Sequence, residues 1–159
     1  MSNWETGAGV PQDPNRPGQP VQWLIEQSED QHSEGNAAAR FFLDGRQDDG
    51  TIWIVRTFDA PANTPLVADL SFDVWSDSES FNTLAKVAAI ASSHRPEEEE
   101  DFDTSEAANL VTGWMDYSYT FDVTGGSEGK GWVALGVSVV WEAEVTCYFD
   151  NVLVEIRPH

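Results

Sequence analysis

The sequence predicts an all-β fold, an antiparallel β-sandwich of the jelly-roll type with about eight strands. Short segments alternate apolar and polar residues with period two, and Gly, Pro, Asn and Asp separate them at regular spacing. No segment shows the 3.6-residue periodicity of a long helix. Eight strands in two sheets is the jelly-roll number. The length of 159 residues supports one domain large enough to bury a core.

The first 20 residues differ from the rest, because they are rich in turn-forming residues. These are Gly7, Gly9, Pro11, Pro14, Pro17, Gly18 and Pro20. We expect residues 1–20 to form an irregular lead-in packed on the sandwich. Residues 21–159 then form the jelly-roll domain.

The first half of the domain contains four expected strands, at 21–26, 37–44, 51–59 and 65–75. Asp49-Gly50 is a strong hairpin signal between the second and third of them. Alternation in the second strand places Ala37, Ala39, Phe41 and Leu43 on one face. The fourth strand directs Leu66, Ala68, Leu70, Phe72 and Val74 inward, and Asp69, Ser71 and Asp73 outward.

The second half begins with an ambiguous segment at 84–92, where the alanines favour a helix and the neighbouring strands favour a strand. We predict a strand. An acidic loop at 96–103 and a helical turn at 104–110 follow. Further strands are expected at 113–123, 132–141 and 145–156.

The charge excludes several partners. There are 28 Asp and Glu against 8 Lys and Arg, a net charge of -20. Nucleic acids and anionic membrane surfaces are bound by clustered Lys and Arg, and the sequence has no such cluster. No apolar run is long enough for a transmembrane helix, and no signal peptide is visible. The localisation is therefore unknown from these features.

The composition also says something about the environment. Only Lys86 and Lys130 are lysines. In molar salt the Debye length shrinks to about 3 Å, which makes such self-repulsion tolerable. The chain resembles acidic proteins of extreme halophiles, so a high-salt environment is expected.

Cysteine and histidine carry little chemistry here. Cys147 is the single cysteine, so an internal disulfide and a cysteine zinc site are excluded. Its place on an alternating segment predicts a small buried apolar residue. His32, His94 and His159 are scattered without metal-ligand spacing.

Several short motifs, taken in order, point to a known family. The closing strand contains an aromatic–Asp–Asn–Val run at 149–152, and an aromatic–Glu–x–Gly motif occurs at 4–7. A His–Ser turn at 32–38 carries one extra residue, and paired apolar strands lie at 52–56 and 70–75. Together they resemble the galactose-binding-like jelly-roll domains, which include many carbohydrate-binding modules of glycoside hydrolases.

The resemblance implies that a polysaccharide or oligosaccharide binds on an exposed sheet face or in the edge loops. Such a module would accompany an enzyme domain outside this chain and would be extracellular. The resemblance also implies a structural Ca²⁺ where the N-terminal segment meets the last strand. Glu5 and Asp150 would supply carboxylates, and a backbone carbonyl near Gly35 or Asn36 would complete the oxygen shell. The alternative is that Asp150 only caps the end of the sheet.

The sugar-binding hypothesis depends on aromatic residues, because the apolar face of a pyranose stacks on a ring while polar groups bond its hydroxyls. Trp53 and Trp75 have the phase opposite to the best core residues. Arg40, Asp69 and Asp73 share that phase on the expected strands and are candidates for hydroxyl binding. The alternative is that the rings fill the core or cover its edges.

Three functions remain open. The first is a non-catalytic carbohydrate-binding domain. The second is a structural or adhesion β-sandwich without sugar affinity. The third is a jelly-roll glycosidase or lyase that uses Glu142 and Glu144, which share one face of a strand at a separation that glycosidases use. With 28 acidic residues an accidental pair is expected, so we predict that the protein is not an enzyme.

Overall fold

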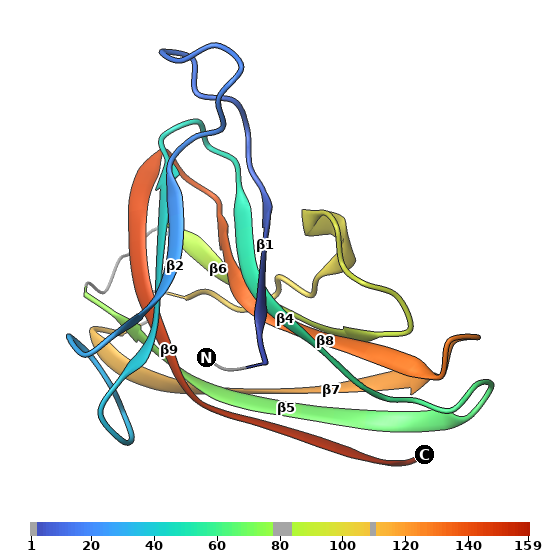
Figure 1. The fold of residues 1–159 in the computed structure, drawn as a ribbon. Helices are drawn as coiled ribbons and strands as arrows, with labels where there is room; N and C mark the ends of the chain where they lie inside the picture. Colours follow the sequence, from blue (N-terminus) through green and yellow to red (C-terminus); the bar gives the residue numbers. More distant parts are fainter. Residues whose placement is uncertain (1–2, 78–83, 109–110) are drawn as a thin grey trace.

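The computed structural model describes residues 3–77, 84–108 and 111–159. Its strands form two antiparallel sheets that face each other across one core (Figure 1). The four-stranded sheet has the order β1-β4-β8-β6, and the five-stranded sheet has the order β2-β3-β9-β5-β7. The predicted antiparallel β-sandwich is confirmed, with nine strands in place of about eight.

The strands of the four-stranded sheet are β1 (Glu5–Gly9), β4 (Thr51–Asp59), β8 (Lys130–Val139) and β6 (Ala85–Ser92). Those of the five-stranded sheet are β2 (Trp23–Ser28), β3 (Ala38–Gly45), β9 (Ala143–Pro158), β5 (Pro65–Ser76) and β7 (Gly113–Thr124). Most strand ends lie within two residues of the expected positions, and the strand assigned to the ambiguous segment at 84–92 is confirmed as β6.

The ninth strand, β1, lies inside the lead-in that was expected to be irregular. Glu5 pairs with Val55, and the register continues to Gly9 opposite Thr51 at the edge of β4. A glycine-rich segment has no alternation of apolar and polar side chains, so the period-two pattern cannot indicate a strand there. Its backbone can still pair with a neighbouring strand. The expectation of an irregular lead-in was therefore wrong for residues 5–9.

The helical turn expected at 104–110 is absent from the described residues 104–108. Asp103 and Ala107 instead form isolated bridges to β6, opposite Ala89 and Lys86. The Val87 amide donates to the Glu106 carbonyl at 2.9 Å, and the Ala89 amide donates to the Asp103 carbonyl at 3.0 Å. A short 3₁₀ turn occurs earlier, at Glu99–Asp101. Residues 109 and 110 lie outside the described residues.

The core lies between the sheets and follows the predicted alternation. Phe41, Phe72 and Phe149 are fully buried, and Phe149 contacts the other two rings, with centroids 4.5 Å apart for Phe41–Phe149 and 5.6 Å apart for Phe72–Phe149. Cys147 is buried beside them, as predicted, and burial raises the pKa of its thiol. Within the described residues, no helix is long and apolar enough to cross a membrane.

The two outer faces of the sandwich differ. On the four-stranded sheet, outward side chains form a second apolar cluster with Phe102, which comes from the connection between β6 and β7. On the five-stranded sheet, the outward positions carry polar and aromatic side chains and are only partly covered. The second face is therefore the place to look for a binding site.

Candidate functional site

Three aromatic residues lie side by side on the outer face of the five-stranded sheet. The strand register places Trp75 of β5 opposite Tyr148 of β9 on one side and opposite Trp114 of β7 on the other. We call Tyr148, Trp75 and Trp114 the aromatic row. Their outward direction follows from alternation, because neighbours on the same strands face the core, namely Val74, Met115, Cys147 and Phe149.

The aromatic row is a partly open surface. Tyr148 is 6% exposed and meets Trp75 edge to face, with ring centroids 5.5 Å apart and an interplanar angle of 84°. Trp75 and Trp114 are half-buried. Because neighbouring strands lie about 4.8 Å apart, the row extends for about 10 Å across the strands.

A charged pair extends the row across the remaining two strands. Arg40 of β3 lies opposite Tyr148, and Glu26 of β2 lies opposite Arg40. The Arg40 guanidinium donates to the Glu26 carboxylate at 2.9 Å. One line across the sheet thus holds hydrogen-bonding groups at one end and aromatic rings at the other.

A second line of side chains, the acidic row, runs parallel to the aromatic row. Asp73 of β5 lies opposite Asp150 of β9 and Asp116 of β7. Each member lies two residues along its strand from a member of the aromatic row, a distance of about 7 Å. Carboxylates therefore lie directly beside the rings.

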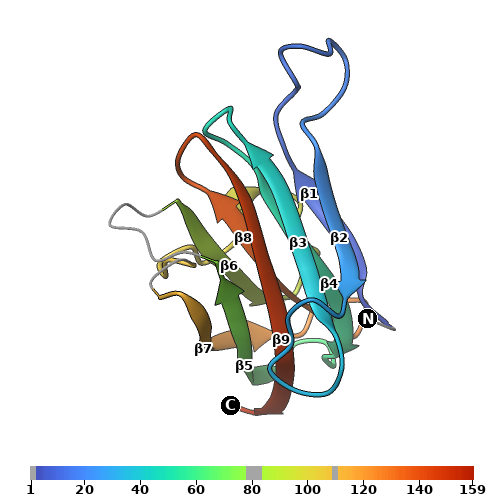
Figure 2. The ribbon, with the colours of Figure 1, turned by 90° about the vertical axis from the view of Figure 1, so that its left-hand side faces the viewer.

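The loop between β2 and β3 is fastened to the acidic row. Oδ2 of Asp150 accepts hydrogen bonds from the backbone amides of Ser33, at 2.8 Å, and Glu34, at 3.0 Å. The Ser33 hydroxyl donates to Asp73 at 2.7 Å. Figure 2 shows this loop in front of β9. The loop borders the outer face next to the acidic row.

These contacts set the charge state of Asp150. Partial burial raises the pKa of its carboxyl, but hydrogen bonds from the amides of Glu34, Asn151 and Ser33 outweigh that effect, so the pKa lies below its ordinary value. Asp150 is therefore ionised near neutral pH and suited to hold the loop.

Polar residues continue along the face beyond the acidic row. Asp69 accepts a hydrogen bond from the Thr120 hydroxyl at 2.7 Å and from the Arg157 guanidinium at 2.9 Å. Both bonds lower the pKa of the Asp69 carboxyl. Ser71, Ser118 and Leu153 line a shallow depression beside Asp69.

Four of the five predicted ligand-binding residues lie on this face, namely Arg40, Asp69, Asp73 and Trp75. Trp53 does not. It lies on β4 in the other sheet, is 3% exposed, and packs against Phe102 at 5.1 Å between ring centroids. The prediction that Trp53 is an exposed binding residue is therefore wrong.

Two glycines help to explain the burial of Trp53. Gly7 and Gly136 are its partners on the neighbouring strands. A Cβ atom added at Gly7 would lie 2.3 Å from the Trp53 indole. A Cβ atom added at Gly136 would lie 2.8 Å from the Cβ atom of Trp53. The indole occupies the space over Gly7, where Phe102 covers it.

Sequence reasoning missed Trp114 and Tyr148 as site residues. Both have the phase opposite to inward residues of their strands, such as Tyr117 and Phe149. That signal was present, but the alignment with Trp75 needs the strand order and register.

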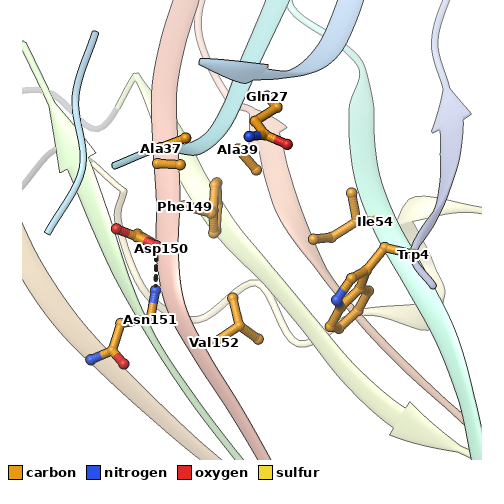
Figure 3. Close-up of a pocket in the computed structure, with 10 residues that line it drawn as sticks. Trp4, Gln27, Ala37, Ala39, Ile54, Phe149, Asp150, Asn151 and Val152 are labelled. Carbon is orange, nitrogen blue, oxygen red and sulfur yellow. Dashed lines mark hydrogen bonds between the residues drawn. The ribbon is translucent and has the colours of Figure 1, made fainter. Parts of the chain in front are cut away.

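The residues expected to bind calcium have other partners. Glu5 forms an ion pair with Arg95 at 2.5 Å, and Asp150 accepts amide hydrogen bonds. Asp150 and Trp4, the residue before Glu5, line the same cavity between the sheets. Figure 3 shows them on opposite sides of this cavity, with the Asp150 carboxylate pointing away from Trp4. Asn36 is exposed in the loop between β2 and β3. This arrangement favours the alternative that Asp150 only caps the end of the sheet, and the Ca²⁺ shell itself stays a prediction.

Two further observations concern metal-binding side chains and the candidate catalytic carboxylates Glu142 and Glu144. No group of three or more His, Cys, Asp and Glu side chains within the described ranges is arranged to hold a metal ion. Glu144 lies 3.7 Å from Arg46, and Glu142 lines a separate depression with Trp141. Glu142 and Glu144 thus do not face each other across one cleft, as the carboxylates of a glycosidase do.

No protein-family model and no curated protein matches the sequence. The fold, however, is similar to solved structures. One comes from work on the promiscuous specificity of carbohydrate-binding modules from the β-sandwich superfamily. It aligns with a TM-score of 0.58 and 13% identity, over 98% of this chain and 58% of the other chain. Another is a xylan-binding domain from Paenibacillus barcinonensis, with a TM-score of 0.54 and 15% identity over 96% and 87% of the two chains.

The same sandwich also occurs inside a larger protein. An arabinose-bound α-L-arabinofuranosidase aligns over 98% of this chain but only 23% of its own length, with a TM-score of 0.62 and 8% identity. This chain also spans only 58% of the first neighbour named above. At these identities the likeness concerns the fold. The chain has the β-sandwich fold found in carbohydrate-binding modules, as its motifs predicted.

Proposed function

We propose that this protein is a non-catalytic carbohydrate-binding domain that holds a polysaccharide or oligosaccharide on the outer face of the five-stranded sheet. The observation that carries the proposal is the aromatic row, with Tyr148, Trp75 and Trp114 on three adjacent strands. Carbohydrate-binding modules of the same fold support it.

The chemistry of the row suits a sugar chain. The C–H face of a pyranose packs on an aromatic ring, and the half-buried rings of Trp75 and Trp114 offer such a surface. Carboxylates accept hydrogen bonds from sugar hydroxyls, and Asp73 and Asp116 lie next to those rings. Arg40 supplies donors at the other end of the row.

The biological setting is part of the proposal. We infer an accessory role beside an enzyme domain that acts on glycans, outside the cell and in high salt. Two facts support this inference: the sandwich forms 23% of a glycosidase chain, and the net charge is -20.

The proposal is tested by affinity electrophoresis against a panel of neutral polysaccharides, followed by calorimetry on the best ligand. Trp75→Ala and Trp114→Ala should each weaken binding by roughly two- to twelvefold, because each ring contributes on the order of 0.5–1.5 kcal/mol of stacking. Trp141→Ala is the matched control, because Trp141 is 57% exposed and lies in the connection between β8 and β9, outside the row.

Retention by one glycan that depends on Trp75 and Trp114 but not on Trp141 supports the proposal. Absence of retention by a folded wild-type protein would overturn it and favour a structural or adhesion role. Equal losses in all three variants would show that binding is not located at the aromatic row.

A further inference from the structure

The cations on the candidate binding face are already neutralised. Its five strands carry two arginines, Arg40 and Arg157. Arg40 binds Glu26 at 2.9 Å, and Arg157 binds Asp69 at 2.9 Å. The strands of this face therefore present no unpaired Lys or Arg side chain to an anionic ligand.

The carboxylates beside the aromatic row are different. Among the described residues, no Lys or Arg makes an ion pair with Asp73 or Asp116. Asp73 receives only the neutral Ser33 hydroxyl, at 2.7 Å, and Asp116 is exposed on β7. Two uncompensated negative charges thus lie about 7 Å along the strands from Trp75 and Trp114.

These charges have a direct consequence for a ligand that lies on the rings. An ionised carboxylate only accepts hydrogen bonds, so Asp73 and Asp116 match hydroxyl donors. A sugar whose C6 is oxidised to a carboxylate would instead place a like charge within several ångströms of both. That repulsion is unfavourable and is opposed only by salt screening.

We propose that Asp73 and Asp116 are specificity-determining residues, which make the aromatic row accept uncharged glycan chains and reject chains that carry carboxylates. The proposal rests on the proposed function, because it concerns the ligand held by the same rings. The proposal differs from a general effect of net charge, since it assigns the rejection of carboxylate-bearing chains to Asp73 and Asp116.

The test compares each neutral polysaccharide with its own C6-oxidised product, so that backbone and linkage stay the same. Affinity is measured at the lowest salt at which fluorescence shows the protein folded, and again in molar salt. Asp73→Asn with Asp116→Asn removes two charges beside the row and keeps an oxygen that accepts from Ser33. Glu97→Gln with Glu100→Gln removes two charges from the loop after β6 and is the matched control.

We expect the wild type to bind the oxidised chain at least tenfold more weakly than the neutral one, with a smaller difference in molar salt. The Asp73/Asp116 variant should lose most of that discrimination, and the Glu97/Glu100 variant should keep it. Asp116→Asn alone should lose part of the discrimination between neutral and oxidised chains. This single variant tests the proposal if the double variant does not fold.

The two proposals fail in different ways. If the wild type binds neutral and oxidised chains equally, or if both double variants lose discrimination equally, the specificity proposal is overturned while sugar binding stands. If the folded wild type binds neither chain, the proposed function is overturned and the specificity proposal falls with it.

Discussion

The outer faces of the two sheets carry similar residues but have opposite environments. Trp53 on β4 and Trp75 on β5 both point away from the core between the sheets. Trp53 is 3% exposed beneath Phe102, whereas Trp75 is half-buried in an open row with Tyr148 and Trp114. Alternation decides on which side of a strand a residue lies, but the connecting segments decide whether that side meets solvent.

The largest expected effect on stability comes from a substitution on the outer face of the four-stranded sheet, which Phe102 covers. Trp53→Ala should lower the free energy of unfolding by about 3–5 kcal/mol, because it empties the space between Gly7, Val55 and Phe102. Trp75→Ala should cost about 1–2 kcal/mol, since its side chain is only partly buried. Urea unfolding in high salt measures both, and equal losses would contradict the difference between the faces.

The next effect concerns the loop at the edge of the open face. Asp150→Ala should lower the free energy of unfolding by about 2 kcal/mol, because the amides of Ser33 and Glu34 lose a charged acceptor. Thermal unfolding followed by circular dichroism checks this value.

The same measurement addresses calcium. The wild type should melt at the same temperature with added Ca²⁺ and with a chelator, because N–H donors already engage Asp150 and Arg95 engages Glu5. A calcium-dependent rise in melting temperature that Asp150→Ala removes would show instead that the carboxylate binds the metal.

A smaller effect follows from pH. The pKa of Asp150 is lower in the folded protein than its ordinary value, so its stabilisation is present above the unfolded value of about 3.9 and is lost as pH falls through the folded value. The stability difference between wild type and Asp150→Asn should be constant from pH 7 to pH 5 and shrink below about pH 4. Paired urea titrations at each pH cancel the effect of the remaining charges, and a difference that grows on acidification would contradict this assignment.

Strands were predictable where burial alternates. β5 follows the period-two pattern closely, because every second residue enters the core between the sheets. In β4 the pattern does not show in the burial of residues 51–55, which are buried on both faces. β1 was not predicted, because its pairing depends on the backbone of β4 and not on its own side chains.

The candidate site was predictable only in part. Arg40, Asp69, Asp73 and Trp75 have the outward phase, which the sequence shows. Their alignment with Tyr148 and Trp114 depends on β9 lying between β3 and β5, and strand order of that kind is not encoded locally.

The smallest expected effect sharpens the contrast between an exposed tryptophan and a site tryptophan. Trp141→Ala should change the free energy of unfolding by less than about 0.5 kcal/mol, because the side chain is 57% exposed. Its fluorescence should also not respond to a bound glycan. A ligand-induced shift that Trp141→Ala abolishes would move the binding site to the connection between β8 and β9.

The strand order also fixes the moment at which the fold can form. β8 lies between β4 and β6, and β9 lies between β3 and β5, so the last two strands join all earlier pairs in both sheets. Residues 130–158, which form β8 and β9, must be synthesised before β4 and β6 can pair with β8 and before β3 and β5 can pair with β9. Until then these strand edges stay open to pairing with other chains.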